Sequence, residues 1–409
     1  MTKRQSRMLI FMCWALYVVA YIGRYSYNAN KLPMSIAYGI DSDTEMGLIS
    51  SFFFFAYGAG QIVNGLLCKF YNLKYVLPGS VFASAVVNFI IYLGVAPFWS
   101  LKYLWMINGI VQSVLWSSLL LALSRSLDEN YIKKAIVAMS TTASIGTLIA
   151  YGLGAILATF GGFRYAFLIA TIVMAAVATL WIFSYDSMTD RKAQNVVAPE
   201  SGDIPVKKKT DRSVFKILII FGIFAIVINF IKDGLTTWIP EILFDTYSLP
   251  ESLSILLTLV LPMLTIFGTT FVVFLNKRIK DYVALICILF GLSSILIGIV
   301  VALFATSLWA IILVAFGFTA LLMGGSNNVV TSILPLSLRD KANSGFVGGM
   351  LNGCCYVGST IASVGLGALK DHFGEWLPVC YFLLGSSVFV VVASAIILLA
   401  KRLSKKTNF

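Results

Sequence analysis

The chain has 409 residues, of which 59% are hydrophobic and only 12% are charged, and its formal net charge is +12 at pH 7. A soluble domain cannot present so apolar a composition to water, so the composition excludes a soluble globular protein and indicates a polytopic membrane protein. The way the positive charge is distributed among the connections argues against a nucleic-acid-binding surface.

Twelve apolar runs follow one another along the chain, and each is long enough to cross a bilayer as a helix. They lie near residues 8–32, 46–67, 75–95, 101–124, 135–159, 164–184, 214–244, 252–275, 282–304, 308–332, 343–368 and 376–400. The first run is too long, and too polar at its far end, for a cleaved signal peptide. We therefore expect an all-α integral membrane protein with twelve transmembrane helices.

The basic residues indicate the orientation of these helices. Of the 30 Lys and Arg residues, 24 fall on the N-terminus, the even-numbered connections and the C-terminus. Four fall on the other side, namely Lys31, Lys102, Arg164 and Lys370, and the remaining two are Arg24 and Lys232. The positive-inside rule then places both termini in the cytoplasm, and we expect the plasma (cell or inner) membrane.

A polar stretch divides the chain into two halves of six predicted helices. We expect an N-terminal bundle at 1–184, a cytoplasmic linker at 185–213 and a C-terminal bundle at 214–409. The linker carries the run Lys207 to Lys209, which could also bind lipid or act as a localisation signal, but the predicted orientation already accounts for it.

The two halves share a repeated pattern. Gly152-Leu153-Gly154-Ala155 recurs as Gly365-Leu366-Gly367-Ala368 at an offset of 213 residues, and Arg24 and Lys232 are 208 residues apart. Both halves begin on the same side of the membrane, so the repeats are parallel and pseudo-symmetric, as in the two-bundle major facilitator fold.

Arg24 and Lys232 are cations inside otherwise apolar runs. A charge held in the bilayer is costly, so such a residue usually faces a cavity and marks a substrate path, and an anion is its natural partner. Tyr17, Tyr21 and Asn28 share one helical face with Arg24, because the four residues are spaced 4, 3 and 4 apart. Hydroxyls beside a guanidinium suit an oxyanion, although interfacial tyrosines could simply anchor the helix.

Asp233, next to Lys232, admits two interpretations. It could be a counter-ion that keeps Lys232 charged, or a proton-coupling carboxylate. Neighbours on a helix point about 100° apart, so direct pairing is not assured. We favour the counter-ion.

Other polar side chains could line the same path. The candidates are Gln112 and Trp116 in the fourth segment, Asn328 in the tenth, and Asn352 and Tyr356 in the eleventh. A polar amide in hydrocarbon needs a partner, which can be another helix or a substrate. For Ser140, Ser144, Thr147, Ser359 and Ser363 we favour close helix packing instead.

Chemistry other than transport has little support in the sequence. The six cysteines show no metal-ligand spacing and are expected to be packing residues, and His372 is expected to be a solvated loop residue. There is no metal cluster, no phosphate-cradling glycine loop and no catalytic nucleophile motif, so we expect neither an enzyme nor a cofactor.

Four motifs resemble the organophosphate:phosphate antiporter family of the major facilitator superfamily, which includes glycerol-3-phosphate and hexose-phosphate transporters. Tyr17, Tyr21 and Arg24 resemble its first-helix phosphate site. The others are Met46-Gly47 through Gly65, then Gly109, Gln112 and Trp116, and finally Lys232-x-Gly234-Leu235-x-x-Trp238-x-Pro240. The resemblance implies that Lys232 is the partner cation of Arg24.

The chain departs from this family at several positions. Glycerol-phosphate members have arginine where this chain has Lys232, a histidine near Ala143 and an acidic residue near Pro262. An acidic residue of the superfamily is missing near Cys68. Lysine offers a compact charge without the planar fork of arginine, so the ligand geometry must differ.

The sequence as a whole predicts a secondary active transporter of a small organic anion, phosphorylated or carboxylated, that works by alternating access and favours exchange. The alternatives are a proton-coupled symporter or exporter of an unrelated solute, and a transporter-like sensor of a phosphorylated metabolite. A single copy carries a complete two-bundle pathway, so we expect a monomer.

Overall fold

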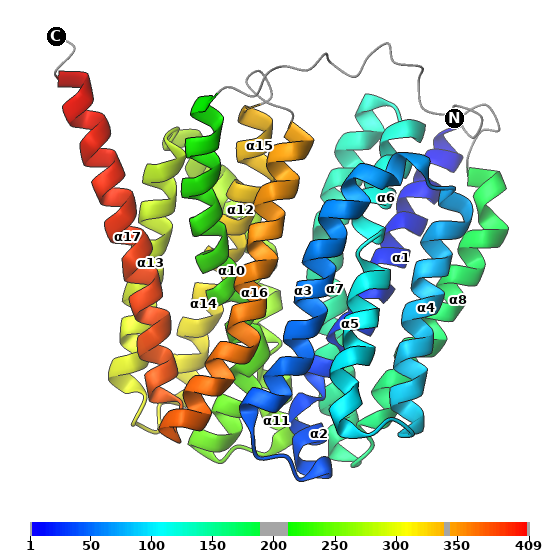
Figure 1. Cartoon of the computed structure of the whole chain (residues 1–409), viewed down its shortest axis with the longest axis horizontal. Coiled ribbons are helices and arrows are strands. Elements are labelled where there is room, and N and C mark those ends of the chain that lie inside the picture. The colour runs from blue at the N-terminus through cyan, green and yellow to red at the C-terminus, as the bar shows by residue number, and fades with distance from the viewer. Residues whose placement is uncertain (1, 189–211, 339–343, 407–409) are drawn as a thin grey trace. The chain divides into compact units, whose positions relative to one another are not determined.

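The computed structural model describes residues 2–188, 212–338 and 344–406, and these residues form helices joined by short connections (Figure 1). Most of the predicted linker, residues 189–211, lies outside the described residues. The chain divides into two compact units, and the first comprises the described parts of Met1–Asp41 and Leu48–Lys208. The second unit comprises Ser42–Gly47 and the described parts of Lys209–Phe409.

The described residues of the first half of the chain form eight α-helices. They are α1 (Lys3–Ala29), α2 (Lys31–Tyr38), α3 (Asp43–Leu67), α4 (Leu73–Leu93), α5 (Leu101–Gln112), α6 (Leu115–Ser126), α7 (Glu129–Thr159) and α8 (Arg164–Met188). Helix α1 packs against α7 and α8, and α4 packs against α8. The first residues of α3 belong to the second unit.

The second half has a similar series of helices. They are α10 (Arg212–Tyr247), α11 (Glu251–Leu257), α12 (Val260–Arg278), α13 (Tyr282–Leu303), α14 (Trp309–Asn328), the π-helical turn η3 (Val329–Ile333), α15 (Leu334–Ser337), α16 (Ser344–Phe373) and α17 (Leu377–Lys406). Here α10 packs on α16, α12 on α14 and α13 on α17.

Among the described residues, eleven helical segments are long and apolar enough to cross a membrane. They match eleven of the twelve predicted spans. The remaining span, 343–368, corresponds to α16, which is 30 residues long but is not among the eleven. Its polar side chains, such as Asn352, Ser359 and Ser363, and its glycines make α16 less apolar than its neighbours.

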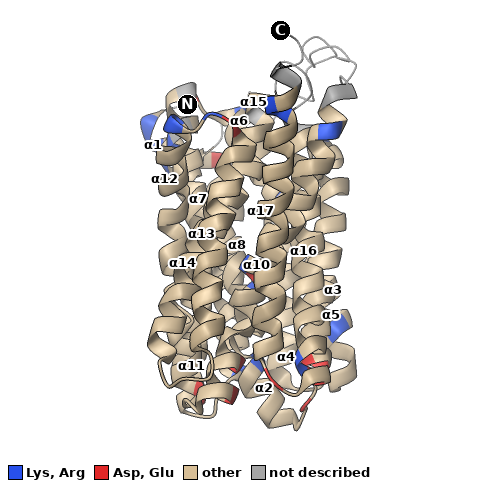
Figure 2. Ribbon diagram, turned by 90° about the vertical axis from the view of Figure 1, so that its left-hand side faces the viewer, with Lys and Arg blue, Asp and Glu red and all other residues tan. Residues whose placement is uncertain are grey.

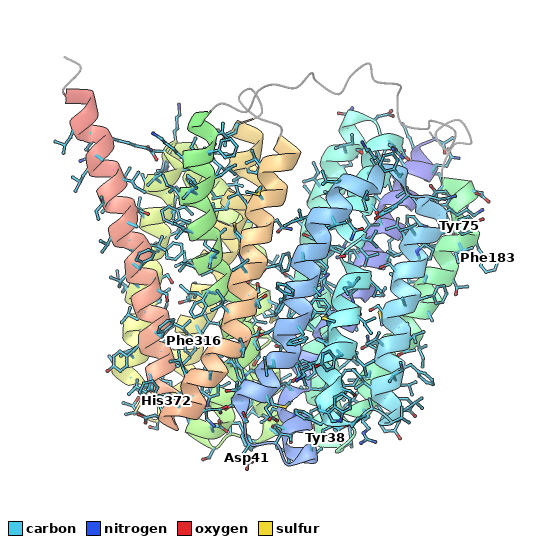
Figure 3. All side chains as sticks on the ribbon, in the orientation of Figure 1. Tyr38, Asp41, Tyr75, Phe183, Phe316 and His372 are labelled. Carbon is cyan, nitrogen blue, oxygen red and sulfur yellow. The ribbon has the colours of Figure 1, made fainter. Side chains whose placement is uncertain are left out.

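Charge and burial follow the pattern expected of helices in a bilayer. Lys, Arg, Asp and Glu gather mainly near the helix ends (Figure 2). Tyr75 on α4 and Phe183 on α8 point outward (Figure 3), and their exposed fractions are 59% and 81%. Phe316 of α14, in contrast, is 1% exposed inside the second unit. Large apolar side chains can face outward because lipid, and not water, surrounds them.

Caps satisfy the first N–H groups of several helices. Thr2 and Gln5 form a capping box at the start of α1. The Asp281 carboxylate accepts hydrogen bonds from Val283 N–H at 2.8 Å and Ala284 N–H at 3.3 Å, and Lys401 Nζ lies 3.0 Å from it. Burial alone would raise the pKa of the Asp281 carboxyl, but the hydrogen bonds from Lys401 and the backbone outweigh it and lower the pKa.

A carboxylate from α16 caps the start of α3. Asp371 accepts hydrogen bonds from Ser42 Oγ at 2.8 Å, from the N–H groups of Asp43 and Thr44 at 2.9 Å each, and from Thr44 Oγ1 at 2.6 Å. Burial acts to raise the pKa of Asp371, but these hydrogen bonds outweigh it and hold the pKa below its ordinary value. Lys370, beside it, lies 3.0 Å from Asp43 and 3.6 Å from Asp245.

Two buried charges were not singled out from the sequence. Lys31 was counted among the cations of the connections, but it begins α2 and is 1% exposed. Glu241 follows Pro240 within α10 and is 4% exposed. His372 lies exposed in the last turn of α16 (Figure 3), where the sequence predicted a loop.

Candidate functional site

In the first unit, Arg24 lies on the predicted polar face of α1 and is only 4% exposed. Its Nε donates a hydrogen bond to Gln112 Oε1 at 3.2 Å. The guanidinium carbon lies 4.4 Å from the centre of the Tyr21 ring and 4.1 Å from that of the Tyr57 ring. Aromatic faces attract a cation, and more strongly where water is excluded, so the two rings stabilise the guanidinium.

The Gln112 amide is oriented by a second layer of polar groups. Its Nε2 donates to Ser84 Oγ at 2.8 Å and to Asn108 Oδ1 at 3.2 Å, and Ser84 Oγ donates to the same Asn108 oxygen at 2.6 Å. All three residues are fully buried. Because the amide nitrogen is engaged with these acceptors, the amide oxygen faces the guanidinium. The Arg24 side chain is thereby fixed in one direction.

The two predicted aromatic partners, Tyr17 and Trp116, stack with ring centroids 5.2 Å apart. The Tyr17 hydroxyl lies 3.3 Å from the hydroxyl of Tyr57, which also accepts a hydrogen bond from Gln61 Nε2 at 2.8 Å. Tyr57 lies within the motif Met46-Gly47 through Gly65, but the sequence did not single it out as a site residue. The structure shows that it contacts both Tyr17 and Arg24.

Asn28 serves as a link between helices in the first unit. Its Oδ1 accepts a hydrogen bond from Ser50 Oγ on α3 at 2.6 Å, and both residues are buried. This contact gives the side chain a packing role, so its participation in binding stays a prediction.

In the second unit, Lys232 and Asp233 of α10 form an ion pair with Nζ 3.2 Å from Oδ1. The two side chains are 23% and 8% exposed. Ser359 Oγ of α16 donates a hydrogen bond to the other carboxylate oxygen. Sequence adjacency left this pairing open, and the long lysine side chain makes it possible. A partly exposed ammonium held by a buried carboxylate can still be approached by an anion.

Asn327 forms a polar cluster near this pair. Its Oδ1 accepts a hydrogen bond from Asn229 Nδ2 at 3.0 Å and from Cys355 Sγ at 3.3 Å. Asn328, the residue predicted from the sequence, is half-buried and lies outside this cluster. Asn352 and Tyr356 are half-buried on α16, on the helix that carries Ser359.

The fourth helix of each half is irregular close to its polar amide. The predicted span 101–124 is broken between α5 and α6 at Ser113 and Val114, directly after Gln112. The span 308–332 turns π-helical at η3, directly after Asn328. Irregular turns inside membrane helices often mark functional sites, because they free backbone groups and re-aim side chains.

The described residues hold no group of three or more His, Cys, Asp and Glu residues that could bind a metal ion. The six cysteines are all free thiols. The first unit offers the buried Arg24 guanidinium, and the second unit offers the Lys232–Asp233 pair. Such groups are suited to reversible binding of an anion.

Solved structures of transporters share this fold. The chain superposes on a bacterial homolog of the human lysosomal transporter Spinster with a TM-score of 0.75 and 16% identity, over 98% of each chain. It superposes on a mutant of the nucleoside transporter NupG with a TM-score of 0.72 and 13% identity, over 95% of this chain and 99% of that one. These likenesses show the fold alone.

Curated relatives have higher sequence identity than these solved structures, but the likeness is still distant. The membrane sensor protein UhpC of Escherichia coli (strain K12) is 27% identical over 112 residues, which is 27% of this chain and a quarter (25%) of that protein's length. Sugar phosphate exchanger 3 of Mus musculus is 21% identical over 400 residues, covering 86% of this chain and 78% of that protein. These distant homologues confirm the resemblance predicted from the motifs.

The family model described as Major Facilitator Superfamily matches residues 13–363, most of the chain. This match confirms an all-helical, multi-pass membrane transporter and a protein that is not an enzyme. On the fold and on this match together, the chain belongs to the Major Facilitator Superfamily.

Proposed function

We propose that this transporter exchanges a small organic anion, in particular an organophosphate, by alternating access. The observation that carries the proposal is the Arg24 guanidinium, which is buried, directed by Gln112 and lined by the Tyr21 and Tyr57 rings. Likeness to sugar phosphate exchangers supports the phosphate ester as the class of anion.

Electrostatics gives the reason for exchange. In our proposal Arg24 and Lys232, one from each unit, bind the same anion during the cycle. In the empty carrier Lys232 is paired with Asp233, and no substrate offsets the charge of Arg24. A dianion that binds both cations offsets the two charges together and takes the place of Asp233 at Lys232. An empty carrier then returns slowly, and a loaded one moves readily. Tyr17, Tyr21, Gln112, Trp116, Asn328, Asn352 and Tyr356 would contribute polar and aromatic contacts.

Asp233 has the role of a counter-ion in this proposal. It lies 3.2 Å from Lys232 and accepts a hydrogen bond from Ser359, so it stabilises the ammonium when no substrate is bound. Because lysine binds a phosphate as a point charge, Arg24 supplies the directional contact and Lys232 the remaining charge.

Reconstituted protein tests the proposal. Liposomes are loaded with unlabelled glycerol 3-phosphate or glucose 6-phosphate, and uptake of the same labelled compound is measured. We expect rapid exchange in the wild type. The exchange rate should fall about tenfold or more in Arg24→Gln and in Lys232→Gln, because each change removes a charge-assisted contact. The control Lys277→Gln, at an exposed site, should exchange at nearly the wild-type rate. Absence of exchange for every phosphate ester, with transport of another solute retained in both variants, would refute it.

Uptake by the same liposomes distinguishes anion exchange from the proton-coupled alternative. If Asp233 is a counter-ion, an imposed pH gradient does not drive uptake. Gradient-driven uptake that Asp233→Asn abolishes would instead assign a proton-carrying role to this carboxylate.

A sensing role is the second candidate, and the likeness to the membrane sensor UhpC favours it. Tight binding of a phosphate ester by purified protein, together with no measurable flux in liposomes, would support the sensor. We further propose that the protein acts as a monomer in the cell or inner membrane, with both termini in the cytoplasm.

A further inference from the structure

A groove in the first unit lies between the N-terminal halves of α1 and α7, which pack along each other. It has a volume of about 490 Å³ and is lined by Arg7, Ile10, Phe11, Trp14, Tyr131, Lys134, Ala138 and Thr141. None of these residues belongs to the candidate substrate site. The proposed substrate binding therefore does not account for the groove.

The two cations of the groove mark the ends of two predicted membrane spans. Arg7 directly precedes the span 8–32, and Lys134 directly precedes the span 135–159. Trp14 and Tyr131 are the residue types enriched where a bilayer meets water. The groove thus crosses the boundary between headgroups and hydrocarbon, with its charged end on the headgroup side.

The charged end is open to a ligand. Arg7 and Lys134 are both exposed, and neither forms an ion pair with a carboxylate among the residues that the structure describes. Lys134 Nζ lies 5.3 Å from the centre of the Tyr131 ring, which steadies the long side chain. An anionic group between the two cations would complete this end of the groove.

The other end of the groove is apolar, and a hydrogen bond between α1 and α7 fixes its shape. Trp14 Nε1 donates a hydrogen bond to Thr141 Oγ1 at 3.1 Å, which ties the indole on α1 to α7. Ile10 and Ala138 contribute apolar surface, and the Phe11 side chain is 61% exposed beside them. A hydrocarbon chain would cover this surface, whereas a small soluble anion would leave it uncovered.

From this combination we propose that the groove binds one anionic phospholipid, with its phosphate headgroup at Arg7 and Lys134 and an acyl chain along Phe11 and Trp14. Basic pockets between transmembrane helices recognise anionic headgroups by charge. A zwitterionic lipid would fill the apolar part equally well, but it would bring a cation toward Arg7 and Lys134. The inference is independent of the solute that the protein transports.

Fluorescence quenching by brominated lipids tests the proposal. Purified protein in detergent is titrated with phosphatidylglycerol or phosphatidylcholine carrying brominated acyl chains, and the signal absent from Trp14→Phe is assigned to Trp14. We expect Trp14 to be quenched with an apparent affinity on the order of tenfold higher for phosphatidylglycerol, since each of the two cations favours an anionic lipid. Inorganic phosphate should not displace the brominated lipid.

Matched variants test whether the preference for phosphatidylglycerol arises at the groove. Arg7→Gln combined with Lys134→Gln should reduce the apparent affinity for phosphatidylglycerol to that for phosphatidylcholine. The control, Lys277→Gln combined with Arg278→Gln, removes the same charge at the exposed end of α12 and should keep the preference. If the double variant at the groove does not yield folded protein, Arg7→Gln alone should still reduce the preference.

Several results would overturn the proposal. One is equal quenching of wild-type Trp14 by the two lipids. Another is an unchanged preference in the groove variants. Full displacement by inorganic phosphate would mean that the cations form a simple anion site without a lipid.

Discussion

The Asp371 carboxylate accepts hydrogen bonds from both the backbone N–H and the hydroxyl of Thr44, a residue 327 positions earlier in the chain. The first N–H groups of a helix have no partners within the helix and need an acceptor. A residue of α16 therefore caps α3, whereas a helix is usually capped by a Ser, Thr, Asp or Asn at its own N-terminus.

Removal of this cap should destabilise the protein. We expect Asp371→Ala to lower the free energy of unfolding by about 0.5–2 kcal/mol, the usual cost of losing an N-cap. Thermal unfolding of the purified protein measures the effect. Glu375→Ala removes an exposed acidic residue shortly after the same helix and should change little. Equal stability of the two variants would show that Asp371 does not act as a cap.

The same carboxylate predicts a dependence on pH. The pKa of Asp371 is lowered in the folded protein, so its stabilising effect is fully present above the ordinary aspartate pKa of about 3.9 and is lost as the pH falls through the lowered value. The difference in melting temperature between wild type and Asp371→Asn should therefore be largest near neutral pH and shrink in acid. A difference that stays constant from pH 7 to pH 3 would argue against this linkage.

Gln112→Glu should impair substrate binding while leaving the fold intact. The new carboxylate would lie where the Gln112 oxygen now accepts from Arg24 at 3.2 Å, and it would compete with an anionic substrate for the guanidinium. We expect the apparent KM for the transported anion to rise about tenfold or more. Gln5→Glu, the same change at the start of α1, should leave KM unaltered. An unaltered KM in Gln112→Glu would mean that the substrate does not use Arg24.

Gly109→Ala should disturb both stability and transport. A Cβ at Gly109 would lie 2.5 Å from the backbone oxygen of Phe53, so α5 would have to move away from α3. Overpacking of this kind costs about 1–3 kcal/mol, and the shift would also displace Gln112 one turn later. Thermal unfolding and exchange rates report the two effects. The control is Gly79→Ala in α4, where nothing lies within 4 Å of the added carbon. Normal exchange in Gly109→Ala would show that the position of α5 is not critical.

The spans and the polar face of α1 could be predicted because they follow from simple periodicities. A run of about 20 apolar residues predicts a membrane helix, and the spacing of Tyr17, Arg24 and Asn28 is that of one helical face. The contacts of Arg24 with Tyr57 and Gln112 could not be predicted in this way, since they depend on how α3 and α5 pack against α1.

Irregularities in the helices were not predicted from the sequence either. The first span was expected to continue to residue 32, but α1 ends at Ala29 and α2 begins at Lys31. The break at Ser113 occurs without a proline in its span, so it arises from tertiary packing, which local propensity does not encode. The π-helical turn η3 directly precedes α15, where Pro335 lacks an N–H group and crowds the carbonyl of Thr331 four residues earlier, a local signal that the predicted span 308–332 did not take into account.

Helix α3 begins in the second unit and continues in the first, with the division between Gly47 and Leu48. Any shift of one unit against the other would therefore strain this helix mechanically. Gly47 is held tightly, because a Cβ there would lie 2.1 Å from the Ser363 oxygen. Such a shift would either bend α3 just after Gly47 or pull its first turn away from Asp371, and the second course would break the four hydrogen bonds to that carboxylate.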